Sequence, residues 1–96
     1  MLQYVIIARD GADSEALQRR MNVRPLHFAG ARQLKDNNNF IAGGATLDEK
    51  GNMDGSVMIV QFETQADMKN WFEKEPYITG NVWQSIEVRP FRLAEV

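Results

Sequence analysis

The sequence contains no cysteine, and this absence excludes disulfide bonds and metal sites built on thiolates. It also has no apolar run long enough for a membrane-spanning helix. Neither sign of charge dominates, because 11 Lys and Arg residues stand against 13 Asp and Glu residues, for a net charge of −2. This balance provides no basic surface for a nucleic-acid backbone or an anionic membrane. We therefore expect a cytoplasmic protein that binds neither nucleic acid nor membrane.

What the chain does contain is typical of one small globular domain. Its 96 residues are 44% apolar and 25% charged, and we treat residues 1–96 as a single domain. A chain of this length buries only roughly 60–65% of the surface that its unfolded form exposes, so its core is thin. The first residues, "MLQYVIIARDG", have no basic segment ahead of the apolar run, and we expect no signal peptide.

Runs of β-branched and aromatic residues, bounded by turn residues, predict four strands. We expect them over residues 2–8, 40–47, 56–62 and 82–91. The segment "DEKGNMDG" (48–55) joins the middle two as a hairpin loop.

Helices are predicted in the two intervals that remain. We expect helical segments over residues 13–22, about 25–36 and 65–74, and a turn or single helical turn within 75–81. Pro25 separates the first two, because proline suits the first position of a helix and breaks its interior. Asp13 or Ser14 is expected to cap the first of them. Thr64 and Asp67 resemble a capping box at the start of the 65–74 helix.

The order β-α-β-β-α-β is typical of ferredoxin-like α+β folds, with a four-stranded antiparallel sheet and two helices on one face. The helices leave the second face bare, yet both faces of the strands are apolar. Leu2, Tyr4 and Ile6 point to one side of the first strand, and Val5 and Ile7 to the other. A sheet with one solvated face alternates instead. We therefore expect the bare face to pack against a second copy in a homodimer.

His27 is the only histidine, and it follows Pro25 by two residues. In the expected helix over 25–36 it falls in the first turn, where the positive end of the helix dipole favours a neutral imidazole that can accept a proton. Arg24, just before that helix, could hold an anion. The pair suits proton abstraction next to a carbonyl group. Alternatively, His27 shares a helix face with Ala31 and Leu34 and belongs to the core.

Two further candidates, Gly44 and Ser56, can each be interpreted in two ways. Gly44, with Gly43, could let a ligand approach the backbone, although glycines in a strand more often mark a bulge. Ser56 could point into a pocket or simply be solvated at the start of a strand.

One histidine and no cysteine give no metal site, and no glycine-rich nucleotide loop is present, so we expect no cofactor. The segment "GSVMIVQF" has aliphatic residues where an RNA-recognition domain needs aromatic ones.

Several segments together resemble the YciI-like (YCII-related) family of the dimeric α/β-barrel group. They are "YVIIARD" (4–10), "DSEALQRRMNVRPLH" (13–27), "AGGA" (42–45), "DGSVMIVQFET" (54–64), "EPYITGNVW" (75–83) and "VRPF" (88–91). The resemblance implies a ferredoxin-like homodimer and acid–base chemistry on a small molecule without a cofactor. The best-defined relatives are similar to dehydrochlorinases that act on chlorinated hydroxyquinols. More distant ones include muconolactone isomerases and cofactor-independent monooxygenases.

Carried over by this resemblance, the family histidine falls on His27 and its preceding arginine on Arg24. The acid has two candidates. Asp36 lies nine residues after His27, about 13.5 Å along a helix, and could join it only through a bend or from another subunit. Glu75 begins Glu75-Pro76-Tyr77, where relatives have Asp-Pro-aromatic, and this places Tyr77 among the candidate substrate-binding residues.

Two functions therefore remain open. The first is a lyase or isomerase, similar to the dehydrochlorinases, that acts on a small anionic or aromatic substrate with His27 as base at a pocket near the dimer interface. The second is a non-catalytic module that binds a small molecule or a protein. The sequence does not decide whether the chain is an enzyme.

Overall fold

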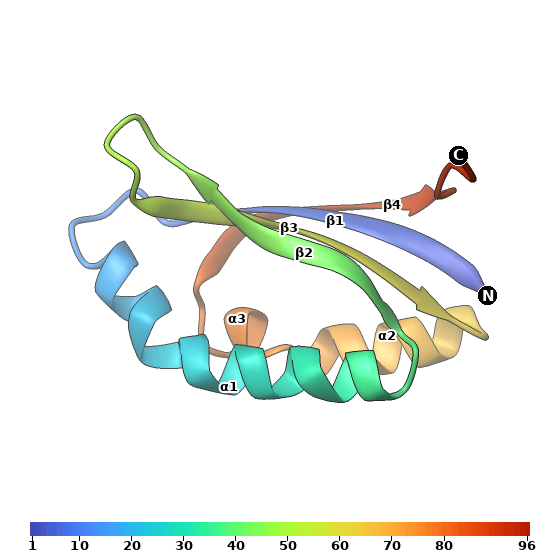
Figure 1. Ribbon diagram of the computed structural model, residues 1–96. Helices are drawn as coiled ribbons and strands as arrows, with labels where there is room; N and C mark the ends of the chain where they lie inside the picture. The colour runs from blue at the N-terminus through green and yellow to red at the C-terminus, as the bar shows by residue number, and fades with distance from the viewer.

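The computed structural model describes all 96 residues as four strands and three helices (Figure 1). In chain order these are β1 (Leu2–Asp10), α1 (Ala16–Asp36), β2 (Phe40–Leu47), β3 (Met53–Phe62), α2 (Gln65–Lys74), α3 (Pro76–Thr79) and β4 (Trp83–Phe91).

The strands form one sheet in the order β2-β3-β1-β4, and every neighbouring pair is antiparallel. All three helices lie on the same side of this sheet, and the other side is bare (Figure 1). The arrangement is the α+β ferredoxin-like fold that the order of the predicted elements indicates, so the fold prediction is confirmed.

Helix α1 is one continuous helix of 21 residues, and the prediction of two helices separated at Pro25 is wrong. Proline removes one backbone hydrogen bond, the one to the carbonyl four residues earlier at Met21. Met21 and Pro25 are both exposed, so water can solvate the carbonyl that is left free. The helix also bends in its first half (Figure 1), as is common around proline.

Two strands are longer than predicted, because their ends lie in segments rich in turn residues. β1 continues to Asp10, and β3 begins at Met53 rather than at residue 56. The Asp48 side chain closes a short hairpin turn by accepting the backbone N–H of Lys50 and of Asn52, both at 2.9 Å. The loop predicted over 48–55 therefore shortens to the turn itself.

The core lies between the sheet and the helices. Its ten buried apolar residues are Ile6, Ala8, Leu34, Met58, Val60, Phe62, Met68, Tyr77, Val82 and Trp83. Strand residues that alternate with these point to the bare face, where Val5 pairs with Ile59 and Ile7 pairs with Val57. The bare face thus has an apolar centre, as the alternation in the sequence predicts.

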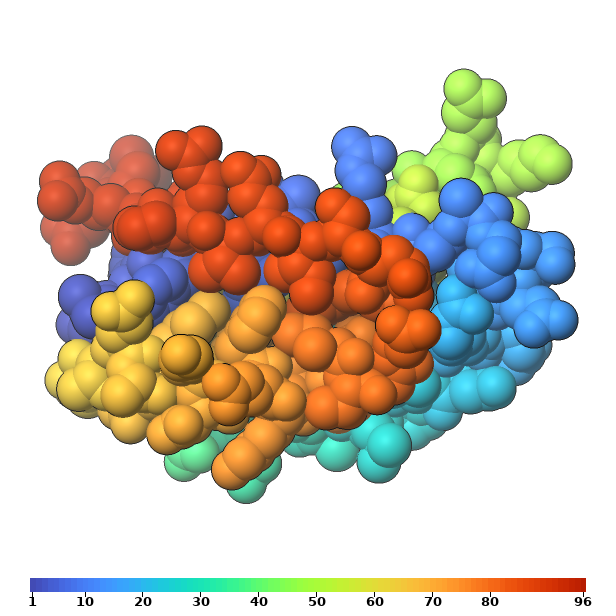
Figure 2. Space-filling model, turned by 180° about the vertical axis from the view of Figure 1, so that it is seen from behind, coloured from blue at the N-terminus to red at the C-terminus, as the bar shows by residue number.

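Seen from behind, β4 lies directly above α2 and α3 (Figure 2). The tip of the β2–β3 hairpin projects at the end of the molecule opposite the C-terminus (Figure 2). None of the helices combines the length and the apolar character that crossing a membrane requires.

We expect Thr64→Ala to lower the free energy of unfolding by about 1 kcal/mol, because it removes the cap of α2. The Thr64 hydroxyl accepts the backbone N–H of Asp67 at 3.1 Å. Ser14→Ala is the matched control, since Ser14 lies beside the start of α1 but caps nothing there. Urea unfolding of both variants measures the difference. Equal losses for the two variants would contradict the assignment of the cap.

Candidate functional site

The only histidine is joined to a buried carboxylate. His27 lies near the middle of α1, and Glu75 is the residue between α2 and α3. The Nδ1 atom of His27 hydrogen-bonds to Oε1 of Glu75, which also accepts the backbone N–H of Tyr77 at 3.2 Å. The side chains are 10% and 1% exposed. The bond therefore fixes the imidazole in an environment largely closed to water.

The position of His27 changes the physical argument made from the sequence. His27 lies eleven residues after Ala16, the first residue of α1, and so it is far from the positive end of the helix dipole. Its tautomer is set by Glu75 instead: with the proton on Nδ1 donated to the carboxylate, the lone pair remains on Nε2. No protein group bonds Nε2, and Nε2 is not among the polar atoms buried without a partner. The free nitrogen is thus accessible as a base.

Tyr77 packs against one face of the imidazole ring. The two rings stack with their centroids 3.9 Å apart and their planes at 12°. Tyr77 is fully buried, and burial raises the pKa of its phenol, so it remains neutral. It supports the His27 ring from within the core and, although it was predicted as a substrate-binding residue, it does not line the cavity that opens beside His27.

A buried ion pair between Arg20 and Asp10 lies beside Tyr77, and it was not predicted from the sequence. Arg20 contacts both carboxylate oxygens of Asp10 at 3.1 Å, and it donates a second hydrogen bond to the Ser56 hydroxyl at 2.9 Å. Its guanidinium carbon lies 4.7 Å from the centre of the Tyr77 ring. Burial raises the pKa of Asp10, while the hydrogen bond and charge of Arg20 act in the opposite direction.

A sequence signal for Arg20 did exist. The four buried residues of α1 are Ala16, Arg20, His27 and Leu34, which recur at the spacing of one helix face. The prediction of a helix break at Pro25 divided this stripe in two and hid it. Reading α1 as a single helix would have placed Arg20 and His27 on the same side.

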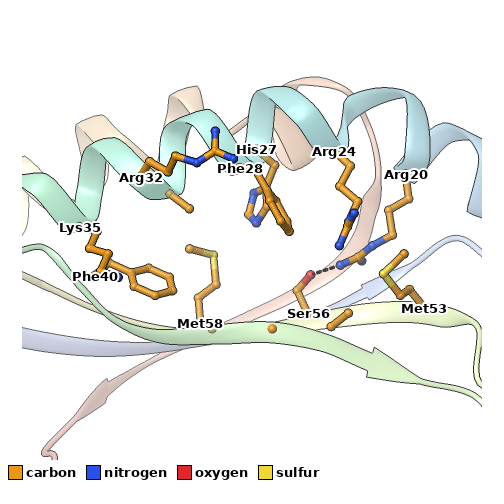
Figure 3. A pocket seen from close by; sticks show the side chains of 14 residues that line it. Arg20, Arg24, His27, Phe28, Arg32, Lys35, Phe40, Met53, Ser56 and Met58 are labelled. Carbon is orange, nitrogen blue, oxygen red and sulfur yellow. Dashed lines mark hydrogen bonds between the residues drawn. The ribbon is translucent and has the colours of Figure 1, made fainter.

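A cavity of about 360 Å³ opens beside His27, between α1 and the strands β2 and β3 (Figure 3). Four cationic residues of α1 line it, namely Arg20, Arg24, Arg32 and Lys35, and no acidic residue does. Its apolar wall includes Phe28, Phe40 and Met58. The cavity is therefore suited to a small molecule with a carbon frame and negative charge.

The structure brings most of the candidate residues to this cavity. Arg24 lines it with its guanidinium 4.3 Å above the Phe28 ring. Ser56 lines it too, and is buried between Arg20 and the indole N–H of Trp83, which donates to the Ser56 hydroxyl at 3.2 Å. It is not the solvated serine of the alternative interpretation.

Gly43 and Gly44 pair regularly with β3, so the preferred interpretation of these glycines as a bulge is wrong. The pairing of β2 is irregular on either side of them, between Phe40 and Ala42 and between Thr46 and Leu47. A Cβ atom at Gly43 would lie 3.1 Å from the Phe40 ring and 3.3 Å from Met58 Cγ. At Gly44, also in the cavity wall, a Cβ atom would meet nothing within 4 Å.

Of the two candidate acids, the fold brings only Glu75 to His27 within the chain. Asp36 is the exposed last residue of α1 and makes no ion pair. The straight-helix estimate made from the sequence agrees with this placement. No group of three or more His, Cys, Asp or Glu side chains could hold a metal ion.

The profile of the YCII-related domain matches residues 2–92. The chain belongs to this family. Protein YciI of Escherichia coli O6:H1 is 33% identical to it over 95 residues, which cover 93% of this YCII-related chain and 95% of the relative. An uncharacterized protein of Haemophilus influenzae is also 33% identical, over 95% of this chain and 97% of its own.

Solved structures share the fold of this YCII-related chain. A 5-chloro-2-hydroxyhydroquinone dehydrochlorinase from Burkholderia phenoliruptrix, in complex with 2,5-dihydroxybenzoquinone, has a TM-score of 0.81 at 23% identity, over 96% of this chain and 95% of that one. A dimeric ferredoxin-like protein of unknown function from Jannaschia has a TM-score of 0.60 at 10% identity, over 97% and 100% of the two chains.

We expect Asp10→Asn to lower the free energy of unfolding by about 3 kcal/mol, because it leaves the buried Arg20 guanidinium without a counter-charge. Asp13→Asn is the matched control, since Asp13 forms an exposed pair with Arg19 at 2.8 Å. Exposed pairs contribute little, so the control should unfold close to the native midpoint. Chemical denaturation measures both, and a similar midpoint for Asp10→Asn and the native protein would contradict a structural role for the buried pair.

Proposed function

We propose that this protein is a cofactor-independent acid–base enzyme of the lyase or isomerase type, acting on a small anionic or aromatic substrate. The observation that carries the proposal is the geometry of His27. One ring nitrogen is bonded to buried Glu75, and the other is free beside a cavity whose charged lining is entirely cationic. A base with a fixed tautomer next to an anion-binding surface is the arrangement that proton abstraction requires.

In the proposed reaction, Nε2 of His27 removes a proton from a carbon next to a carbonyl group or from a phenolic hydroxyl. The electron pair moves onto the substrate oxygen, and the imidazolium is stabilised by Glu75 through Nδ1–H. An isomerase then returns the proton to another carbon. A dehydrochlorinase-like lyase instead expels chloride, so that one proton and one chloride leave the substrate.

Arg24 is proposed to hold the negative charge that develops on the substrate oxygen. Its guanidinium lines the cavity and rests on the Phe28 ring, which limits its motion. Gly44 contributes backbone alone to the opposite wall, and Ser56 contributes a hydroxyl group. The likeness in fold to a dehydrochlorinase in complex with 2,5-dihydroxybenzoquinone supports the proposal of a lyase of this kind.

We also propose that the working unit is a homodimer joined through the bare sheet face. Val5, Ile7, Val57 and Ile59 form an apolar centre there, and Ile7 is 41% exposed in the single chain. Burying this face in a twofold interface would enlarge the thin core of the chain. The dimeric state of the Jannaschia protein with the same fold supports this arrangement.

Replacement of His27 by Gln is expected to reduce turnover by about 100- to 10,000-fold, the usual contribution of a general base, while the protein stays folded. The native protein and the variant should be compared on a panel of chlorinated hydroxyquinols, lactones and enolisable acids, with circular dichroism as the check on folding. A folded variant with full activity would contradict the role of His27. Binding without turnover of any panel member by the native protein would favour the non-catalytic module.

The two candidate acids are distinguished by a matched pair of variants. Glu75→Gln keeps an oxygen that can accept from Tyr77 but loses the charge behind the imidazole, and we expect turnover to fall at least about tenfold. Asp36→Asn removes an exposed charge that does not reach His27 within the chain. A larger loss for Asp36→Asn would mean that a second subunit supplies the acid.

The dimer is tested by placing a charge on each face of the sheet. We expect Ile7→Lys to give a monomer, because the lysine would be buried against the partner without a counter-ion. Val88→Lys is the matched control, since Val88 is 38% exposed on the face that carries the helices. Analytical ultracentrifugation measures the mass of each variant, and a dimeric Ile7→Lys would place the interface elsewhere.

A further inference from the structure

Three cations of the cavity have no acidic partner. Arg20 is paired with Asp10. By contrast, no carboxylate forms an ion pair with Arg24, Arg32 or Lys35. All three line the cavity beside His27. In a chain with a net charge of −2, this concentration of unpaired positive charge in one hollow is a local feature and does not follow from composition.

The unpaired cations are divided between two ends of the cavity. Arg24 lies on one side of His27, and Arg32 and Lys35 lie on the other (Figure 3). Arg24 and Arg32 are eight residues apart on α1, which is about 12 Å along the helix axis. Side chains of this length can bend toward each other, so the two positive ends can close on one small molecule.

Most of the remaining lining is apolar. Phe28 lies beside the His27 ring, Met58 lies on the strand side below Arg32, and Phe40 lies next to Lys35 (Figure 3). A flat unsaturated carbon frame fits such a surface, whereas a third charge would be placed against hydrocarbon. The volume of about 360 Å³ is at the small end for ligand sites and corresponds to about one substituted ring.

From this distribution we infer that the substrate is a small dianion, with a carboxylate or equivalent anionic group at each end of a planar unsaturated frame. One anion binds Arg24, the other binds Arg32 and Lys35, and the frame lies beneath Nε2 of His27. The inference rests on the proposed function for its chemistry, but the preference for two negative charges is a binding property that can be measured without turnover.

Isothermal titration with benzoate and with benzene-1,4-dicarboxylate, at low ionic strength, tests the inference. We expect the dicarboxylate to bind at least tenfold more tightly than benzoate. Arg24→Gln and the double variant Arg32→Gln/Lys35→Gln each remove one end, and each should bring the dicarboxylate down to the affinity of benzoate. Equal affinities of the native protein for the two compounds would overturn the inference.

The matched control is Lys50→Gln/Lys69→Gln, which removes two exposed cations outside the cavity and should keep the tenfold ratio. A loss of the ratio in this control would assign the preference to net charge rather than to the site, and would also overturn the inference.

His27→Gln separates this inference from the proposed function. If the variant and the native protein both prefer the dicarboxylate but the native protein turns over no dianion, the site binds dianions and the proposed catalysis fails. If the native protein turns over neutral or singly charged compounds and shows no preference for the dicarboxylate, the catalysis stands and the inference fails.

Discussion

The arrangement of the whole site depends on one buried contact, between His27 and Glu75. A carboxylate that is 1% exposed is costly to bury without hydrogen-bond partners, and here Oε1 of Glu75 bonds the imidazole and accepts the backbone N–H of Tyr77 in α3. The contact therefore ties α3 to the middle of α1. That attachment in turn places Tyr77 against the imidazole, and the guanidinium of Arg20 also packs on the Tyr77 ring.

The buried polar residues that stabilise the fold consequently also belong to the proposed site. Arg20, Ser56 and Trp83 form a hydrogen-bonded group at one end of the cavity, and the same group links α1 to β3 and β4. A chain of 96 residues has little apolar core to spare, and it uses buried polar side chains as part of its interior. Arg20 and Ser56, which also line the cavity, are thus held by buried hydrogen bonds.

The sequence predicted the fold well because hydrophobic periodicity and turn residues are local signals. The bounds of β2 and α2, the cap at Thr64 and the helical turn after Glu75 follow from neighbours within a few residues. The single helix α1 was mispredicted because the cost of Pro25 depends on whether the freed carbonyl can reach water, which is a tertiary property. Arg20 was missed for a related reason, because the predicted break at Pro25 divided the helix face that Arg20 shares with His27. His27 and Glu75 are 48 residues apart, and only the resemblance to a family pointed to their meeting.

The glycines of β2 belong to the wall of the cavity that faces α1. The proposed base and every cation of the lining come from α1, whereas the facing wall is an edge strand with a bare backbone at Gly44. Gly43 faces the cavity, because it pairs with the buried Met58, and a Cβ atom there would lie 3.1 Å from the Phe40 ring and 3.3 Å from Met58 Cγ. A side chain at Gly43 would therefore displace the apolar wall of the cavity, while the helix that carries the proposed base stays as it is.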